Sequence, residues 1–299
     1  MASRKKITIV THSSSFHTDD IFAVATLLLV LEKNNDVTVK RSRDEQIINS
    51  ADYVVDVGGV YDPVTNRFDH HQEGGAGKRE NGVPYASFGL VWKKFGDKLS
   101  GSKEIAEKID LQMVQPVDAP DNGFQFLKSS IPDLFALDIG FLTNIFTPTW
   151  KEKERNIDEV FMKLVSYAQT ILDRGITVEK NGLIAKEILL DTYNKTEDKR
   201  IIFVDDSYPW EEMLSKFPEP LFVVYKSRDK NWSIKGIRDD RHSFKLRKKL
   251  PEGWAGKEKE ELEKVTGVPG SMFCHNNLFM AVNKTKEGIL KMAEIALNS

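Results

Sequence analysis

Residues 6–59, KITIVTHSSSFHTDDIFAVATLLLVLEKNNDVTVKRSRDEQIINSADYVVDVGG, decide the fold class of this chain. Three β-branched runs alternate with two helix-like segments: predicted strands at 6–11, 36–41 and 53–57, and predicted helices at 19–33 and 45–49. Thr18 is well placed to cap the first helix. Strands that alternate with helices indicate a parallel, doubly wound sheet, so an α/β domain is expected here.

The rest of the chain continues as a mixture of helices and strands. The pattern predicts helices at 88–95, 102–114, 155–174 and 183–195, strands at 201–204, 221–225 and 232–238, and a last helix that Thr285 caps and that runs to 297. Residues 134–150 carry apolar residues, turn signals and Pro148, and remain undecided. We therefore expect a first domain at 1–150, a helical connection at 151–198 and a smaller mixed α/β domain at 199–299.

Composition sets the limits within which the function must lie. A length of 299 residues favours two domains, and 40% hydrophobic with 10% aromatic residues is enough to fill their cores. The net charge of −2 provides no global field for nucleic acid or anionic membranes. The single cysteine, Cys274, excludes an intrachain disulfide framework and fits a reducing compartment. Without an apolar run of about 20 residues or a signal-like N-terminus, we expect no membrane association and a cytoplasmic location.

One local charge cluster departs from this balance. Residues 226–249 contain ten lysines and arginines against only three acids, Asp229, Asp239 and Asp240. A local excess of seven positive charges is a candidate phosphate-facing surface. The alternative is an ordinary solvated surface of strands and turns.

Histidines and aspartates gather where the predicted strands end. Four of the six histidines lie within the first 71 residues: His12, His17, His70 and His71. Four aspartates accompany them: Asp19, Asp20, Asp56 and Asp69. In open α/β sheets, ligands collect outside the carboxyl ends of the strands, where the strand order reverses. Imidazoles and carboxylates that converge there predict a metal site.

Each of these residues also has a purely structural interpretation. Asp19 and Asp20 suit the positive N-terminus of a helix, and Asp56 before two glycines suits a turn. The pair His70 and His71 fits a surface turn. A site without metal would require every one of these structural interpretations to be correct at the same time, so the metal site is favoured. Because adjacent side chains point in different directions, one histidine of the pair is expected to bind metal and the other to face the substrate.

The chain resembles the melanocyte proliferating gene exonuclease family, within the superfamily of DHH phosphoesterases. The segments that carry the resemblance are THSSSFHTDD (11–20), DVGGVYDP (56–63), RFDHHQ (67–72), PYASFGLV (84–91), DAPDNG (118–123), LPEGW (250–254), VPG (268–270), His275 and NKT (283–285). They span nearly the whole chain and are densest over residues 8–123. The resemblance implies a DHH domain with a parallel doubly wound sheet, followed by a smaller mixed α/β substrate-binding domain.

The same resemblance implies a metal-dependent phosphodiesterase, which in eukaryotic members is described as a 3′-to-5′ exonuclease on RNA. The motif match implies these metal ligands: His12, His17, Asp19, Asp56, His70 and either Asp118 or Asp121, of which Asp121 is favoured. The implied catalytic residues are Asp56 as a bridging carboxylate, His71 as the group that faces the phosphate, and Asp69 as the residue that orients His70. The implied substrate is RNA or a short oligonucleotide.

Two departures from the family pattern affect the expectations. The superfamily usually has His-x3-Asp-x-Asp, whereas this chain has His12-x4-His17-x-Asp19. An imidazole favours softer ions than magnesium, so the divalent metal is expected to be manganese, with magnesium as the alternative. The family's two glycines before the asparagine at 283 are replaced by Ala281 and Val282, which limits how closely a phosphate can approach the backbone.

The second domain is expected to supply substrate-binding residues. Arg247 and Lys248 lie in the basic cluster, and His275, Asn283 and Lys284 precede the last helix. Two other functions remain open: a small-molecule phosphoesterase or pyrophosphatase for dinucleotides or polyphosphates, and a metal-binding regulatory protein without catalysis. The oligomeric state is also open, with a homodimer among the alternatives.

Overall fold

The computed structural model describes residues 4–134, 136–240, 243 and 245–299, and the chain divides into two compact units, Met1–Lys180 and Asn181–Ser299. Arg241 of the basic cluster lies outside the described residues. The expected domains at 1–150 and 199–299 fall one in each unit, and the two units share the expected connection at 151–198.

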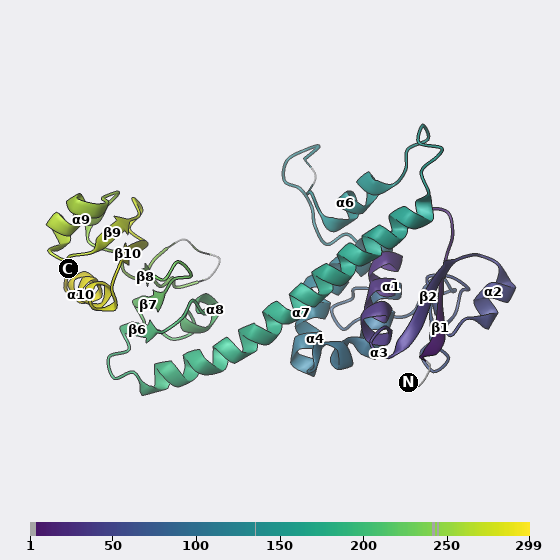
Figure 1. Ribbon diagram of the computed structural model, residues 1–299, viewed down its shortest axis with the longest axis horizontal. Helices are drawn as coiled ribbons and strands as arrows, with labels where there is room; N and C mark the ends of the chain where they lie inside the picture. Colours follow the sequence, from purple (N-terminus) through teal and green to yellow (C-terminus); the bar gives the residue numbers. More distant parts are fainter. Residues whose placement is uncertain (1–3, 135, 241–242, 244) are drawn as a thin grey trace. The chain divides into compact units, whose positions relative to one another are not determined.

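That connection is a single helix, α7 (Ile157–Lys195), so the prediction of two helices at 155–174 and 183–195 was wrong (Figure 1). Gly175 lies in the predicted break, but there it serves close packing. A Cβ atom at Gly175 would come within 2.6 Å of Met113 Sδ. The glycine therefore allows a close approach between α7 and a neighbouring helix without ending α7.

The first unit contains a mostly parallel sheet of five strands in the order β2-β1-β3-β5-β4. The strands are β1 (Lys5–Thr11), β2 (Asn35–Arg41), β3 (Tyr53–Val55), β4 (Tyr61–Asp62) and β5 (Arg67–Phe68). The pairs β1/β2, β1/β3 and β3/β5 are parallel, which confirms the predicted parallel sheet, whereas the edge strand β4 runs antiparallel to β5. The strand order reverses between β1 and β3.

Both faces of this sheet are covered. Val10 and Val54 pack with Ile48 of α2 (Glu45–Ser50) on one face. Ile9 and Val55, which point to the other face because side chains alternate along a strand, are fully buried as well. Figure 1 shows α1 (Thr18–Leu31) and α3 (Ser87–Ser100) beside the sheet on the side opposite to α2. This is the predicted doubly wound arrangement.

The start of α1 differs from the prediction in one detail. Its N-cap is His17, and Thr18 is its first helical residue. The backbone N–H of His17 donates to Asp20 Oδ1 at 2.8 Å. Asp20 therefore stabilises the start of the helix, as its structural interpretation required, and this bond occupies only one of its two oxygens.

Further helices complete the first unit. The predicted helix at 102–114 consists of α4 (Lys103–Ile109) and a π-helical turn (Asp110–Val114), and it continues as α5 (Gln115–Asp121). The undecided region contains α6 (Ile139–Phe146), where Thr143 Oγ1 lies 3.2 Å from Thr18 Oγ1. The π-helical turn and α5 bring the aspartates of the DAPDNG segment next to α3.

The second unit is a mixed sheet in the order β6-β7-β8-β10-β9 with helices on both faces. Its strands are β6 (Ile201–Val204), β7 (Phe222–Lys226), β8 (Trp232–Gly236), β9 (Ser271–Cys274) and β10 (Met280–Asn283). Its helices are α8 (Glu211–Leu214), a 3₁₀ turn (Glu252–Trp254), α9 (Lys259–Thr266) and α10 (Lys286–Asn298). Only β6/β7 is parallel, which confirms the expected antiparallel character. As predicted, Thr285 caps α10. Cys274 is buried in the core.

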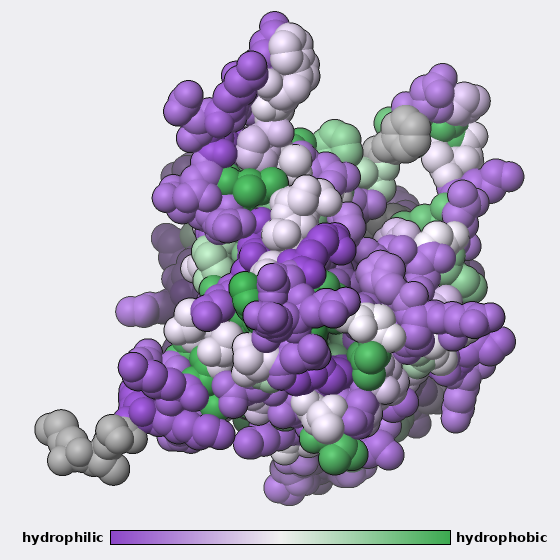
Figure 2. All heavy atoms as spheres, turned by 90° about the vertical axis from the view of Figure 1, so that its right-hand side faces the viewer, coloured by the Kyte–Doolittle hydropathy of each residue, from purple (hydrophilic) through white to green (hydrophobic). Residues whose placement is uncertain are grey.

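One face of the molecule is predominantly polar. On the face drawn in Figure 2, apolar side chains form small separate groups among polar ones. Among the described residues, no helix combines the length and the apolar character needed to cross a membrane.

Candidate metal centre

Three parallel strands deliver the first residues of the site. His12 follows β1, Asp56 follows β3, and His70 follows β5, so all three leave the same edge of the sheet. This edge includes the reversal of strand order between β1 and β3, where ligands collect in such sheets. The side chains of the three residues are buried.

Asp56 lies at the centre of this cluster. Its Oδ2 atom is 3.3 Å from His12 Nε2, and its Oδ1 atom is 3.3 Å from His70 Nε2. The hydroxyl of Ser87 donates to Oδ1 at 3.1 Å. The backbone of Asp56 has a φ of 56°, a left-handed conformation that is costly for a residue other than glycine. The carboxylate thus presents a different oxygen to each histidine.

His17 and Asp20 border the cluster on the side of His12. The rings of His12 and His17 are 5.4 Å apart. Asp20 Oδ2 lies 3.2 Å from His12 Nε2 and has no hydrogen-bond partner although it is fully buried. Nitrogen atoms of His12 and His17 and an oxygen of Asp56 all lie within 4.8 Å of one another.

Asp19 and Asp121 border the cluster on the side of His70. Asp121 Oδ2 lies 3.2 Å from His70 Nε2, and ligand atoms of Asp19, His70 and Asp121 lie within 4.8 Å of one another. The two oxygens of Asp19 accept from the N–H groups of Ser87 and Phe88, at 3.0 and 2.7 Å. Since the N-cap of α3 is an alanine, Asp19 supplies the missing cap from another helix.

The DHH segment is arranged differently from the expectation for Asp69. Asp69 Oδ1 lies 2.7 Å from Nδ1 of His71, not next to His70, and its Oδ2 accepts from the N–H of Gly59 at 2.6 Å. The prediction that Asp69 orients His70 is therefore wrong. The residue beside His70 Nδ1 is Asn122, whose Oδ1 lies at 3.3 Å. The rings of His70 and His71 lie 4.3 Å apart, and His71 Nδ1 also lies 3.5 Å from Asp56 Oδ1, but His71 is the histidine that Asp69 contacts.

The two candidates at the end of α5 have different surroundings. Asp118 is fully buried, with Oδ1 accepting from the N–H of Gly89 at 3.0 Å and Oδ2 2.8 Å from Arg79 Nη2. Arg79 also pairs with Asp110, with Nη2 2.7 Å from Oδ1. Arg79 thus neutralises Asp118, whereas Asp121 faces His70.

The concentration of carboxylates shifts their pKa values. Burial raises the pKa of Asp20 to about 7, and the nearby charge of Asp56 adds to the effect. Burial together with the charges of Asp56 and Asp121 holds the pKa of Asp19 well above its usual range. Burial also opposes the ionisation of Asp56, but His12 and His70 outweigh it and lower its pKa. Asp19 and Asp20 therefore retain protons more readily than ordinary carboxyl groups, whereas Asp56 remains ionised.

The donor set fits divalent metal ions. His12 Nε2, His70 Nε2 and Asp20 Oδ2 are buried and have no hydrogen-bond partner. Each of them lies 3.2 or 3.3 Å from a neighbouring charged group without a hydrogen bond, and such buried polar atoms are costly unless something binds them. Three groups of ligand atoms, with Asp56 shared by two of them and His70 shared by two, could hold metal ions. Mixed imidazole and carboxylate donors suit manganese as well as zinc or iron.

The basic residues expected to bind substrate are engaged within the second unit. The guanidinium of Arg247 donates to the carbonyls of Phe217, Pro220 and Ser215. Lys248 Nζ lies 3.1 Å from the carbonyl of Leu297 and 2.8 Å from that of Ser299. These two side chains tie loops and the C-terminus together.

Three substrate-binding candidates remain. His275 directly follows β9, Asn283 is the last residue of β10, and Lys284 lies just before α10. Asn283 is fully buried, and its Oδ1 accepts from the N–H of Thr285 at 2.9 Å, so it supports the start of the helix. Lys284 is exposed at the same end of α10. The ring of His275 lies 4.3 Å from that of Phe279, and its Nδ1 accepts from the N–H of Asn277.

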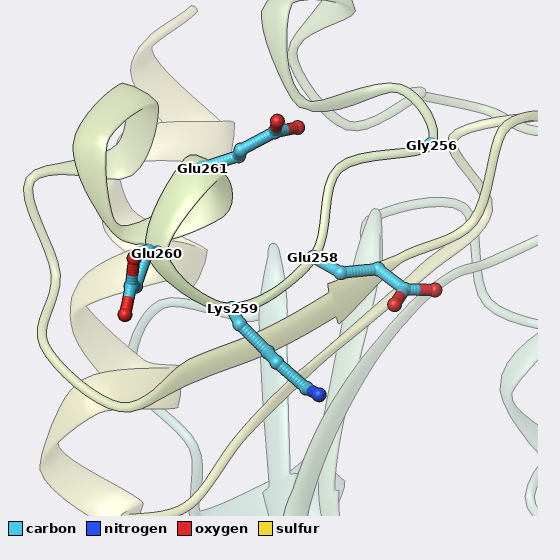
Figure 3. A pocket seen from close by; sticks show the side chains of 5 residues that line it. All are labelled: Gly256, Glu258, Lys259, Glu260 and Glu261. Atoms are coloured by element: carbon cyan, nitrogen blue, oxygen red, sulfur yellow. The ribbon is translucent and has the colours of Figure 1, made fainter.

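A hollow at the start of α9 lies apart from all these residues. Figure 3 shows its lining, which is Gly256, Glu258, Lys259, Glu260 and Glu261. The three glutamate side chains point in different directions, and none of the five residues belongs to the predicted site.

Sequence reasoning missed several residues that build the cluster. Asp20 was counted among the aspartates near the predicted site but not assigned as a ligand, and no role was predicted for Ser87, Asn122 or Arg79. Ser87 and Asn122 lie inside the segments that carry the family resemblance, so their position beside candidate ligands was the available signal. Arg79 lies outside those segments, and only the folded structure reveals its pairing with Asp118.

The fold and the site together define an α/β protein with a buried histidine and aspartate cluster, able to hold metal ions, at the switch point of a mostly parallel sheet. A family model described as an uncharacterised protein family (UPF0160), the MYG1 exonuclease family, matches residues 8–297. The chain belongs to this family. The resemblance to the melanocyte proliferating gene exonucleases is thereby confirmed.

Relatives are similar over almost their full length. A MYG1 protein of Schizosaccharomyces pombe is 31% identical over 98% of this chain and 98% of its own. The MYG1 exonuclease of Homo sapiens is 31% identical over 97% of this chain and 85% of its own. Among solved structures, an exopolyphosphatase-related protein from Bacteroides fragilis has 13% identity and a TM-score of 0.24, over 99% of this chain and 92% of its own. That score is too low to support any conclusion.

Proposed function

We propose that this protein is a metal-dependent phosphodiesterase that removes nucleotides one at a time from the 3′ end of RNA or short oligonucleotides. Relatives named as exonucleases support hydrolysis of nucleic acid. The observation that carries the proposal is the position of Asp56 between His12 and His70, with one carboxylate oxygen 3.3 Å from each Nε2 atom. A carboxylate placed in this way suits two adjacent cations.

The residues that would hold the metal ions form two sets around Asp56. His12 and His17 lie with Asp56 in one set, and His70 and His71 lie with it in the other. His70 also groups with Asp19 and Asp121, and within each group the ligand atoms lie within 4.8 Å of one another. Divalent cations supply charge neutralisation at a phosphate group and a nucleophile at neutral pH. Manganese is proposed because two of the three groups contain two imidazoles, with magnesium as the alternative.

His71 is the proposed proton donor to the leaving oxygen. Its side chain is 59% exposed, whereas that of His70 is 7% exposed, so His71 is the histidine of the pair that a substrate can reach. The carboxylate of Asp69 accepts a hydrogen bond from Nδ1–H at 2.7 Å, which fixes the ring and leaves Nε2 to face solvent or substrate. An imidazole held in this way can deliver a proton as the phosphodiester bond breaks.

The test is hydrolysis of a 5′-labelled RNA with Mn²⁺, resolved by chain length, with the wild type and with His71→Ala. The wild type is expected to shorten the RNA stepwise, and His71→Ala to be slower by about 10²- to 10⁴-fold, the usual contribution of general acid catalysis. An RNA of the same sequence with a blocked 3′ end is the control for polarity, and the matching DNA is the control for sugar preference. Absence of shortening with every divalent metal would contradict the proposal.

A small-molecule phosphoesterase is the second candidate. It is favoured by the internal engagement of Arg247 and Lys248, which removes two cations from the surface expected to follow a nucleic acid backbone. Dinucleotides and polyphosphates are the substrates for this alternative. Hydrolysis of a dinucleotide without any action on longer RNA would favour it.

A further inference from the structure

Arg41 is a buried cation next to the metal cluster that has no part in the function proposed above. It is the last residue of β2 and lies directly opposite Thr11 in the parallel pairing with β1. Its side chain is only 3% exposed. Burying a guanidinium requires partners, and the identity of these partners shows what Arg41 does.

Two of its partners lie in the loop that carries His12 and His17. Arg41 Nη2 donates to the carbonyl of Ser14 at 3.0 Å and to that of Ser15 at 2.8 Å. The other hydrogen bonds of this loop are made within itself or to the first turn of α1, such as the bond from His17 to Asp20. In the described part of the chain, Arg41 is therefore the link from this loop to a neighbouring strand.

The loop needs such a link because its backbone is not in a relaxed conformation. Ser14 has a φ of 80°, a left-handed conformation that side chains other than glycine rarely adopt. Both Ser14 and Ser15 are exposed, so packing does not hold them in place. Hydrogen bonds from a fixed donor can hold this conformation, and they set the distance between the two histidines and Asp56.

Arg41 itself is held firmly. Its Nη1 lies 2.6 Å from Asp158 Oδ1, in the first turn of α7. The guanidinium carbon lies 4.7 Å from the ring centre of Phe161 and 5.9 Å from that of Phe16. An arginine that stacks on an aromatic ring while it donates hydrogen bonds to two segments holds those segments in a fixed relative position. A lysine, with its single ammonium group, cannot reproduce this.

We propose that Arg41 is a positioning residue that holds the loop of His12 and His17 in the conformation that binds metal. This inference rests on the metal site of the proposed function. Residues that orient metal ligands through hydrogen bonds commonly contribute 10- to 100-fold to metal affinity. Arg41 acts on the loop backbone that carries the ligands rather than on a ligand ring.

The test is the affinity of the full chain for Mn²⁺, measured by calorimetry without any substrate. Arg41→Ala is expected to weaken Mn²⁺ binding by about 10- to 100-fold. Arg41→Lys is expected to weaken it as well, because one ammonium group cannot replace the planar fork. Arg200→Ala, which removes an exposed arginine paired with Asp198 in the second unit, is the matched control and is expected to keep the wild-type affinity.

Three results would overturn the inference: wild-type affinity in a folded Arg41→Ala chain, wild-type affinity in Arg41→Lys, or an equal loss of affinity in Arg200→Ala. If Arg41→Ala does not fold, Arg41→Lys decides the question. A wild type that binds no divalent metal overturns both this inference and the proposed function. A wild type that binds Mn²⁺ but leaves RNA intact contradicts the proposed function alone, and the affinities of the variants still test Arg41.

Discussion

Asp69 Oδ1 lies 2.7 Å from Nδ1 of His71, and the same carboxylate receives the N–H of Gly59 on its other oxygen. This pairing joins a buried acid to an exposed imidazole of the cluster. It fixes the proton of His71 on Nδ1, so that Nε2 remains for the reaction. The segment Asp69-His70-His71 thus places one buried and one exposed imidazole beside Asp56, whose Oδ1 lies 3.3 Å from His70 Nε2 and 3.5 Å from His71 Nδ1.

Asp69→Asn should impair catalysis without removing the metal. Loss of the negative charge weakens the hydrogen bond that orients the His71 ring, so kcat should fall by about 10²-fold or more. The affinity for Mn²⁺ should stay at the wild-type value, because Asp69 contacts His71 and Gly59 and is not itself one of the candidate ligands. Turnover and calorimetry on the same preparations check this. A variant that lost Mn²⁺ binding would show that Asp69 supports the metal site instead.

The stability of the metal-free protein should fall as the pH rises. Burial raises the pKa of Asp20 and of Asp118 to about 7, and for Asp118 nearby Arg79 opposes the shift. The folded chain therefore keeps protons on these two carboxyl groups that the unfolded chain loses above about pH 4. The stability that they contribute at low pH is lost by about pH 7. Burial lowers the pKa of His70, but Asp121 and Asp56 outweigh it and raise it to about 11. The stability that protonated His70 contributes is fully present below pH 6.5, the ordinary pKa of a histidine. It is also lost as the pH rises.

The carboxyl groups and His70 both make the folded chain less stable as the pH rises, so melting temperatures at two pH values test them together. In EDTA, the melting temperature should be lower at about pH 8 than at about pH 5.5. The stabilisation that Mn²⁺ adds should grow over the same range, since metal ligands must lose their protons before they bind. A melting temperature in EDTA that rises over this range would contradict the surroundings described for these carboxyl groups.

Gly89→Ala should destabilise the first unit. A Cβ atom at this position would lie 1.9 Å from Asp118 Oδ2 and 2.7 Å from Arg79 Nη2, so the buried pair must move. Overpacking of this kind costs about 1–3 kcal/mol, which a shift of the urea midpoint would show. The control is Gly182→Ala in α7, where nothing lies within 4 Å of the new atom. It should stabilise the helix by about 0.5–1 kcal/mol. Equal midpoints for Gly89→Ala and wild type would disprove the close contact.

Much of the site could be predicted because it depends on local sequence and on sheet topology. Hydrophobic periodicity predicted β1 and β3, and parallel strands place their carboxyl ends at one edge, which brings His12 to Asp56. The family motifs added His70 and Asp121. The parallel character of the first sheet and the mixed character of the second were also predicted, whereas the order of the strands comes from the structure alone.

The contacts that were missed depend on tertiary packing, which local patterns do not encode. Asp19 caps α3 from another helix, and Arg79 reaches Asp118 across 39 positions of sequence. Residues 175–182 resembled a break between two helices because glycine weakens helix propensity, but close packing at Gly175 favours a continuous α7. Arg247 resembled a phosphate ligand, although its donors are directed to three carbonyls of its own unit.

The most direct test of the central claim is the anomalous scattering of manganese in crystals of the full chain grown with Mn²⁺. The account predicts strong peaks beside the carboxylate of Asp56, one next to His12 and one next to His70, and their loss in crystals of Asp56→Asn. Manganese bound elsewhere on the chain, with no peak among these three residues, would contradict the assignment of the cluster as the metal centre.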